Sequence, residues 1–315
     1  MESTFQINLN TYKMTFKPNF CFLILCILIL LSCEKEVKMD LASGPAKLVV
    51  EGNIETDRFP FVVLTKSVGY FSKIDLELIQ NSFAHDAIVT ISDGNQTIQL
   101  KEYTIDTGTN SLIKFYIYTI DTSSITALNF RGKKETTYDL KIKFEGNTYT
   151  ASTKIPNVDP LDSVWFRKPK GRAPIAASMM MYVRYSDPDT LGNYARYFTK
   201  TQYSPFYPGF NSVFEDAIIN GQTLDSLNLV AGYDRSRDIE IDSLGFYFMT
   251  DTVTLKWCAI DKDVYQFFRT YEYAIRTVGN PFATPVNIKT NIKGGALGYW
   301  AGYGSYYKTI VVPVE

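Results

Sequence analysis

This sequence has few histidine and cysteine side chains that could carry out catalysis. His85 is the sole histidine, so a multi-histidine metal site is excluded and one imidazole remains as the base of any catalytic triad. Its segment, 81–86, is a polar connector before a strand-like run, which favours a surface position. Cys258 lies in the strand-like run 252–260. That setting is typical of a buried structural thiol and not of a nucleophile.

Oxygen ligands gather in the turn 187–193, where Asp187, Asp189 and Asn193 could hold calcium. The turn lacks the EF-hand spacing and its distal Glu, so a solvated Asx turn is the alternative interpretation. No phosphate-binding glycine loop, HExxH motif or GxSxG motif is present. Pairs of acids that could serve a glycosidase are too numerous to select two. The sequence therefore favours a protein without enzymatic activity, and it indicates no catalytic residue and no cofactor.

An aromatic and proline-rich segment, 203–210, is the best candidate for contact with a ligand or partner. We predict a loop here, in which Pro and Gly restrict the backbone and Tyr203, Phe206, Tyr207 and Phe210 present their rings at low entropic cost. The alternative is that these rings cover the underlying sheet.

The N-terminus carries the pattern of an export signal. An apolar run at 20–31 follows Lys13 and Lys17 and is too short for a spanning helix, so we predict a signal peptide over 1–32. Leu30-Leu31-Ser32-Cys33 resembles the lipobox of bacterial lipoproteins. The resemblance implies that Cys33 becomes the acylated first residue and anchors the chain in membrane lipid. The alternative is an ordinary secretory signal in which this match is accidental.

Charge and length limit the remaining possibilities. The 315-residue chain has 32 Lys and Arg against 33 Asp and Glu, a net charge of −1, which argues against binding to nucleic acid. The length is sufficient for two domains of ordinary size. Residues 33–46, with charges followed by Ser43-Gly44-Pro45, predict a lipidated tether.

Strand-like runs dominate the rest, so we predict an all-β fold in the main. About seven short runs with Gly and Asn turns over 47–155 predict an immunoglobulin-like β-sandwich. Pro156 and Pro160 interrupt sheet hydrogen bonding and indicate the start of a second β-rich domain, 156–315. Apolar residues at spacings of three and four predict one long helix near 261–278, with Asp261 as its cap.

At several blocks the chain resembles a family of Bacteroidota outer-membrane lipoproteins, a domain of unknown function often encoded beside TonB-dependent receptors. The blocks that carry the resemblance are Leu48-Val-Val-Glu-Gly-Asn-Ile54, Tyr149-Thr-Ala-Ser152 with Ile155-Pro156 and Leu161-Asp-Ser-Val164, Asn193-Tyr-Ala-Arg-Tyr-Phe198, Ile260-Asp-Lys262, Gly279-Asn-Pro-Phe282 and Asn291-Ile-Lys-Gly-Gly-Ala-Leu-Gly-Tyr299. The resemblance implies an outer-membrane location and a transport setting, but no catalytic residues. Gly294, Gly295 and Gly298 also have a structural interpretation, as a bulge or a close backbone approach.

Two hypotheses about function follow. The first is a lipid-anchored, surface-exposed binding or accessory subunit of a TonB-dependent uptake system, with a TonB-dependent outer-membrane receptor as its partner. The second is a carboxylate-dependent hydrolase outside the cytoplasm that acts on glycans, which requires two acids facing each other across a cleft.

Overall fold

The computed structural model describes residues 44–69, 72–106, 114–170, 177–236 and 245–314. The predicted signal peptide, Cys33 and the tether up to residue 43 lie outside these ranges. Within them, no helix combines the length and apolar character needed to cross a membrane.

The described residues are mainly β, as the sequence predicts. The elements are β1 (Leu48–Glu55), β2 (Phe61–Lys66), α2 (Leu76–Asn81), β3 (Ile88–Ser92), β4 (Thr97–Asp106), β5 (Lys114–Ile120), α3 (Ile125–Leu128), β6 (Thr137–Phe144), β7 (Asn147–Lys154), β8 (Ser163–Arg167), β9 (Ser178–Ser186), β10 (Tyr194–Lys200), β11 (Tyr207–Glu215), β12 (Thr223–Leu229), β13 (Tyr247–Phe248), β14 (Thr252–Ile260), α4 (Lys262–Thr277) and β15 (Leu297–Val311).

The predicted long helix is confirmed as α4. Asp261 is its N-cap, and its carboxylate accepts a hydrogen bond of 2.8 Å from the backbone N–H of Val264. The carboxylate also accepts a bond of 2.5 Å from the Thr153 hydroxyl at the end of β7. Asp261 therefore begins the helix and fixes its start to a strand from much earlier in the chain.

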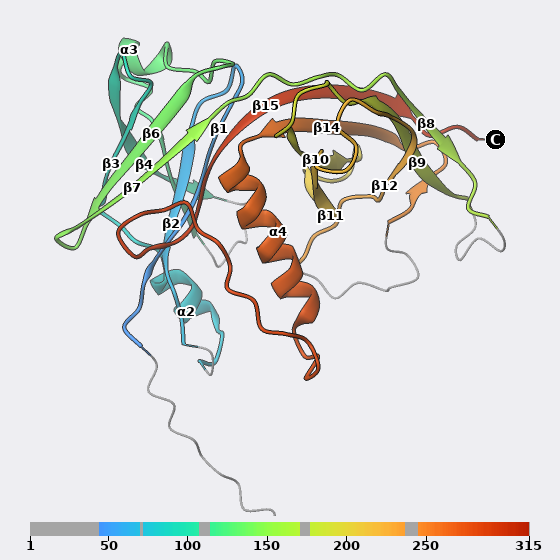
Figure 1. Cartoon of the computed structure of the whole chain (residues 1–315). Coiled ribbons are helices and arrows are strands. Elements are labelled where there is room, and N and C mark those ends of the chain that lie inside the picture. The colour runs from blue at the N-terminus through green and yellow to red at the C-terminus, as the bar shows by residue number, and fades with distance from the viewer. Residues whose placement is uncertain (1–43, 70–71, 107–113, 171–176, 237–244, 315) are drawn as a thin grey trace, which may run out of the picture. The chain divides into compact units, whose positions relative to one another are not determined.

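Most strands belong to one sheet with the order β11-β10-β14-β15-β1-β2-β5-β4-β3-β6-β7. All of its pairings are antiparallel except that of β1 with β15, which is parallel. The long strand β15 (red in Figure 1) pairs with β1 through Leu297–Tyr303 and then with β14 through Gly304–Val311. One strand thus serves two parts of the sheet in succession.

The first part of the sheet surrounds a core of alternating apolar residues from β1 to β7. Trp300 of β15 is fully buried in this core, and its indole N–H donates to the carbonyl of Tyr138 at 2.9 Å. Gly298 lies directly against β1, where an added Cβ would come within 1.9 Å of the Val50 carbonyl oxygen. The glycine block therefore permits a close backbone approach, which is the structural interpretation made from the sequence.

The second part has two hydrophobic clusters. One lies between the large sheet and a smaller sheet of order β12-β9-β13, with β8 paired to β9. In the other, Val264, Phe267 and Phe268 of α4 pack on β14 and β15. Figure 1 shows α4 lying beside β10, β11 and β14. The apolar helix face predicted from the sequence therefore packs onto the sheet.

The division into domains near residue 156 stays a prediction. Ile155 belongs to the first core and Leu161 to the second, so the hydrophobic cluster changes between them. Strand β15 nevertheless pairs on both sides of this division.

Candidate functional site

One cavity, which we call the acidic cavity, has a volume of about 690 Å³ and lies beside β10, β12 and β14. Its walls are mainly apolar, with Tyr185, Phe214 and Trp257 as the large side chains. Carboxylates of Asp159, Asp187 and Asp216 also line it. A preformed apolar cavity with a few converging polar groups is the usual form of a small-molecule site.

Asp187 and Asp216 are both buried at this cavity. Asp216 accepts hydrogen bonds from the backbone N–H groups of Gly192 at 2.8 Å and Asn193 at 2.9 Å. Burial raises the pKa of Asp187, and the negative charge of Asp216 raises it further. A protonated Asp187 beside a second carboxyl group could donate a proton or a hydrogen bond to a ligand.

The structure brings two of the three predicted calcium ligands together with Asp216. Asp187 and Asn193 line the acidic cavity, whereas Asp189 does not line it and accepts a hydrogen bond from Asn220 Nδ2 at 3.3 Å. The Asn193 side-chain amide donates to the carbonyl and hydroxyl of Thr190. In the described ranges, no group of three His, Cys, Asp or Glu residues is placed to hold a metal ion.

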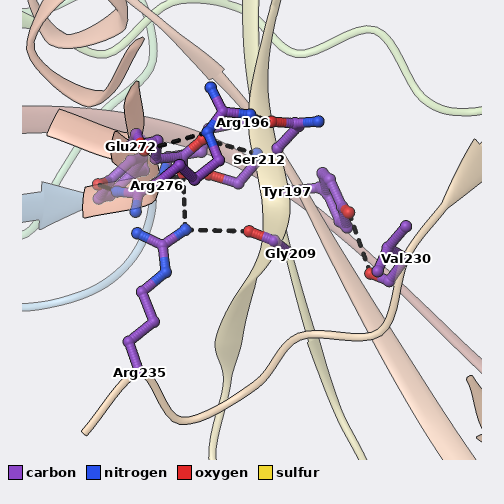
Figure 2. A network of polar contacts seen from close by, with 10 residues as sticks. Arg196, Tyr197, Gly209, Ser212, Val230, Arg235, Glu272 and Arg276 are labelled. Atoms are coloured by element: carbon purple, nitrogen blue, oxygen red, sulfur yellow. Dashed lines mark hydrogen bonds and ion pairs between the residues drawn. The ribbon is translucent and has the colours of Figure 1, made fainter. Parts of the chain in front are cut away.

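A buried polar network lies on the other side of β10, between the sheet and α4 (Figure 2). Glu272 of α4 is 3 % exposed, and its carboxylate accepts bonds from the Ser212 hydroxyl at 2.5 Å and the Ser212 N–H at 3.0 Å. Arg235 reaches the same carboxylate at 2.9 Å and also donates to the Gly209 carbonyl at 3.0 Å. Arg276 donates to the backbone carbonyl of Glu272.

Arg196 of β10 completes the network and is only 5 % exposed. Its guanidinium donates to Ser212 Oγ at 3.3 Å and to the Tyr303 hydroxyl at 2.8 Å, and it lies 3.2 Å from the centre of the Phe268 ring. Arg196 and Arg235 both line a second cavity of about 380 Å³, which we call the arginine cavity.

The prediction of a loop over 203–210 is partly wrong, because Tyr207 and Phe210 lie in strand β11. This is an edge strand of the large sheet, where Pro208 is tolerated. The Tyr207 hydroxyl bonds to Asp234 at 3.3 Å, and the Phe210 ring stacks on Tyr233.

The remaining rings of this segment differ from each other. Phe206 packs against Tyr307, and the Lys200 ammonium lies over its ring. Tyr203 is 87 % exposed in the turn before β11. The four aromatic residues therefore do not form one exposed surface, and Tyr203 is the ring with the greatest access to a partner.

His85 and Cys258 lie where the sequence predicts. His85 is at the surface, with Nδ1 2.6 Å from the Glu102 carboxylate and its ring edge against Tyr116. Cys258 is fully buried, and burial raises the pKa of its thiol to about 11. At neutral pH such a thiol stays protonated and unreactive.

The sequence reasoning missed the Arg196 network, although a local signal for it exists. Arg196 interrupts an aromatic run in 193–199, and Glu272 lies between Tyr271 and Tyr273 on α4. A charged residue between aromatic residues is the pattern that could have identified both residues.

Comparison with known proteins shows the family of this chain. The sequence model for the domain of unknown function DUF4249 matches residues 34–309. No curated protein and no solved structure matches the chain. Since the family match covers most of its length, the chain belongs to the DUF4249 family.

Proposed function

We propose that this protein is a lipid-anchored, surface-exposed protein of the outer membrane that binds a small ligand in the acidic cavity as an accessory subunit of TonB-dependent nutrient uptake. The observation that carries the binding role is the cavity of about 690 Å³ with apolar walls and buried carboxyl groups. Sites of this form commonly bind small molecules. The anchor rests on the lipobox-like residues that end at Cys33.

The anchor is tested by the mass and the location of the protein. After extraction in detergent, the intact mass should lack the residues before Cys33 and include lipid chains, and a Cys33→Ala variant should leave the membrane fraction. A Cys33→Ala variant that stays membrane-bound would contradict the anchor.

The transport role is tested by affinity purification in mild detergent, followed by mass spectrometry of the partners. We expect a TonB-dependent receptor to co-purify. Replacing the exposed Tyr203 by Ala should weaken this association, whereas the matched replacement of Phe282, another exposed aromatic residue in a turn, should not. Repeated purifications that contain no transporter would contradict the transport role.

The second candidate is a carboxylate-dependent hydrolase of glycans, and the buried pair of Asp187 and Asp216 favours it. A raised pKa of Asp187 is the property required of a general acid that protonates a leaving group. Hydrolysis of glycan substrates that is lost in Asp187→Asn and in Asp216→Asn, with substrate binding kept, would replace the accessory role by this activity. Retained binding without any turnover in the unaltered protein favours the accessory role.

A further inference from the structure

The buried network between α4 and β10 contains more positive than negative charge. Arg196 and Arg235 are each cationic, and among the described residues Glu272 is the only carboxylate that bonds to them. Glu51 lines the adjacent arginine cavity, where burial raises the pKa of its carboxyl group and so favours its neutral form. In the part of the chain that the structure describes, no carboxylate lies within ion-pair distance of Arg196, and the partners of Arg196 are neutral hydroxyl groups and aromatic rings. Burying a cation without a counter-ion is costly, so a surplus charge here calls for an anion.

The arginine cavity is where such an anion can reach the network. Both arginines line it, and within the described residues the Nε–H of Arg235 is buried without a hydrogen-bond partner. The other walls are mainly apolar or aromatic, with Phe267, Tyr271 and Tyr299 as the large side chains, and the polar residues Glu51 and Thr290 also line the cavity. This cavity shares no lining residue with the acidic cavity.

We propose that the arginine cavity binds a small organic acid, whose carboxylate contacts the guanidinium groups of Arg196 and Arg235 and whose apolar or aromatic body packs against α4 and β15. A planar guanidinium matches a carboxylate in geometry and charge. The aromatic walls and the volume of about 380 Å³ suit an acid with one ring. Glu51 also lines the cavity and disfavours a doubly charged group such as a phosphate monoester.

This site goes beyond the proposed function, because it assigns a second ligand to a cavity on a different face of β10. The experiment is isothermal titration calorimetry on the full mature protein in lipid nanodiscs, with empty nanodiscs as the blank. Phenylacetate is the probe, phenylacetamide is its neutral counterpart, and phenyl phosphate is the competing anion.

Phenylacetate should bind with a stoichiometry of one, and phenylacetamide should bind at least about tenfold more weakly because it lacks the charge. Arg196→Gln should weaken phenylacetate binding by about tenfold or more, whereas Arg269→Gln, at an exposed arginine of α4 that pairs with Glu215, should leave it unchanged.

A pair of charge substitutions at Ile288 keeps the test valid if Arg196→Gln does not fold. Ile288 lines the cavity but is 45 % exposed, so either charge is tolerated at that position. Ile288→Glu should weaken phenylacetate binding by about fivefold, and Ile288→Lys should leave it equal or tighter. The proposal would be overturned if phenylacetate bound equally to the two Ile288 variants, or if phenylacetate and phenylacetamide bound equally to the unaltered protein. It would also be overturned if phenyl phosphate bound more tightly than phenylacetate, or if phenylacetate showed no saturable binding.

Discussion

Two buried carboxylates of this protein, Glu55 and Glu272, are paired with basic residues from distant parts of the sequence. Glu55 of β1 pairs with Lys256 of β14 and accepts a hydrogen bond from the Tyr307 hydroxyl of β15. Glu272 of α4 is likewise held by Ser212 and Arg235. Removing one partner therefore leaves the other buried and unpaired.

Glu272→Gln should destabilise the protein strongly, because it removes the buried carboxylate that pairs with Arg235 while Arg196 stays buried nearby. We expect the free energy of unfolding to fall by about 3 kcal/mol or more, measured by urea denaturation. The control is Glu215→Gln, which breaks an exposed pair with Arg269 and should cost less than about 1 kcal/mol. Similar losses in the two variants would show that the buried network does not contribute in this way.

The raised pKa of Asp187 predicts that the stability of the protein depends on pH. Its pKa in the folded state is raised above the ordinary value of 3.8, first by burial and then by the charge of Asp216. The folded state therefore holds this proton at a pH where the unfolded state has lost it, so the contribution of Asp187 to stability decreases as pH rises through that window. Asp187→Asn cannot titrate and should avoid this decrease.

Urea denaturation from about pH 4 to about pH 7 tests the dependence. The stability of Asp187→Asn relative to the unaltered protein should rise with pH, whereas Asp225→Asn, at an exposed position, should show no such trend. Parallel pH profiles for Asp187→Asn and the unaltered protein would contradict the prediction.

Asp261, the N-cap of helix α4, also bonds to residues outside the helix. The Asp261 carboxylate bonds to Val264 N–H within the helix, and to the Thr153 hydroxyl and Lys154 N–H at the end of β7. The helix start is thereby fixed to the strand that closes the first core. The side chain of Asp75, the N-cap of the short helix α2, has Leu78 N–H of its own helix as its one hydrogen-bond partner among the described residues.

Asp261→Ala should therefore cost more stability than Asp75→Ala. Loss of an N-cap alone costs about 1 kcal/mol, which is the value that we expect for Asp75→Ala. Asp261→Ala also leaves the partly buried Thr153 hydroxyl without its partner, so we expect about 2 to 4 kcal/mol. Thermal or urea unfolding of the two variants measures the difference, and equal costs would contradict the role in joining α4 to β7.

The glycine block at the start of β15 offers a second matched pair of substitutions, at Gly295 and Gly298. Gly295 and Gly298 both have positive φ, of 90° and 99°, but a Cβ would have open space at Gly295 and would clash with the Val50 carbonyl at Gly298. Gly295→Ala should cost about 1 to 2 kcal/mol from the backbone conformation alone. Gly298→Ala should cost at least about 2 kcal/mol more, because β1 and β15 must separate. Equal stability of the two variants in urea would disprove the close contact.

The molecule as a whole is joined by β15, which pairs with β1 in its first half and with β14 in its second half. Trp300 is buried in the first core, and Tyr303 of the same strand packs in the cluster beneath α4. Since one strand contributes to both, neither core can lose β15 without effect on the other.

We therefore expect the two cores to unfold together. Hydrogen exchange with mass spectrometry at increasing urea should give the same opening free energy for peptides from β6 and from β14. Peptides from α2, which has no buried residue, serve as a comparison and should open at lower urea concentration. Distinct opening free energies for β6 and β14 would indicate two independent folding units.

Local patterns in the sequence were sufficient to predict the β class, the helix α4 with its cap at Asp261, and the burial of Cys258. These features repeat at the period of a strand or a helix, or depend on residues a few positions apart, so neighbouring residues contain the information. The aromatic segment 203–210 marks the limit of such reasoning. Proline and glycine favour a loop there, but Pro208 also fits the edge strand that β11 forms.

The two cavities and the Arg196 network were decided only by the tertiary structure. Ser212 and Glu272 are 60 residues apart, Arg196 and Tyr303 are 107 apart, and the acids at 187 and 216 converge only because β9 to β12 fold against each other. Long-range strand pairing sets such distances, and the pairing of β1 with β15 spans nearly the whole described chain. Hydrophobic periodicity specifies which face of an element is buried, but it does not specify which distant element packs on that face.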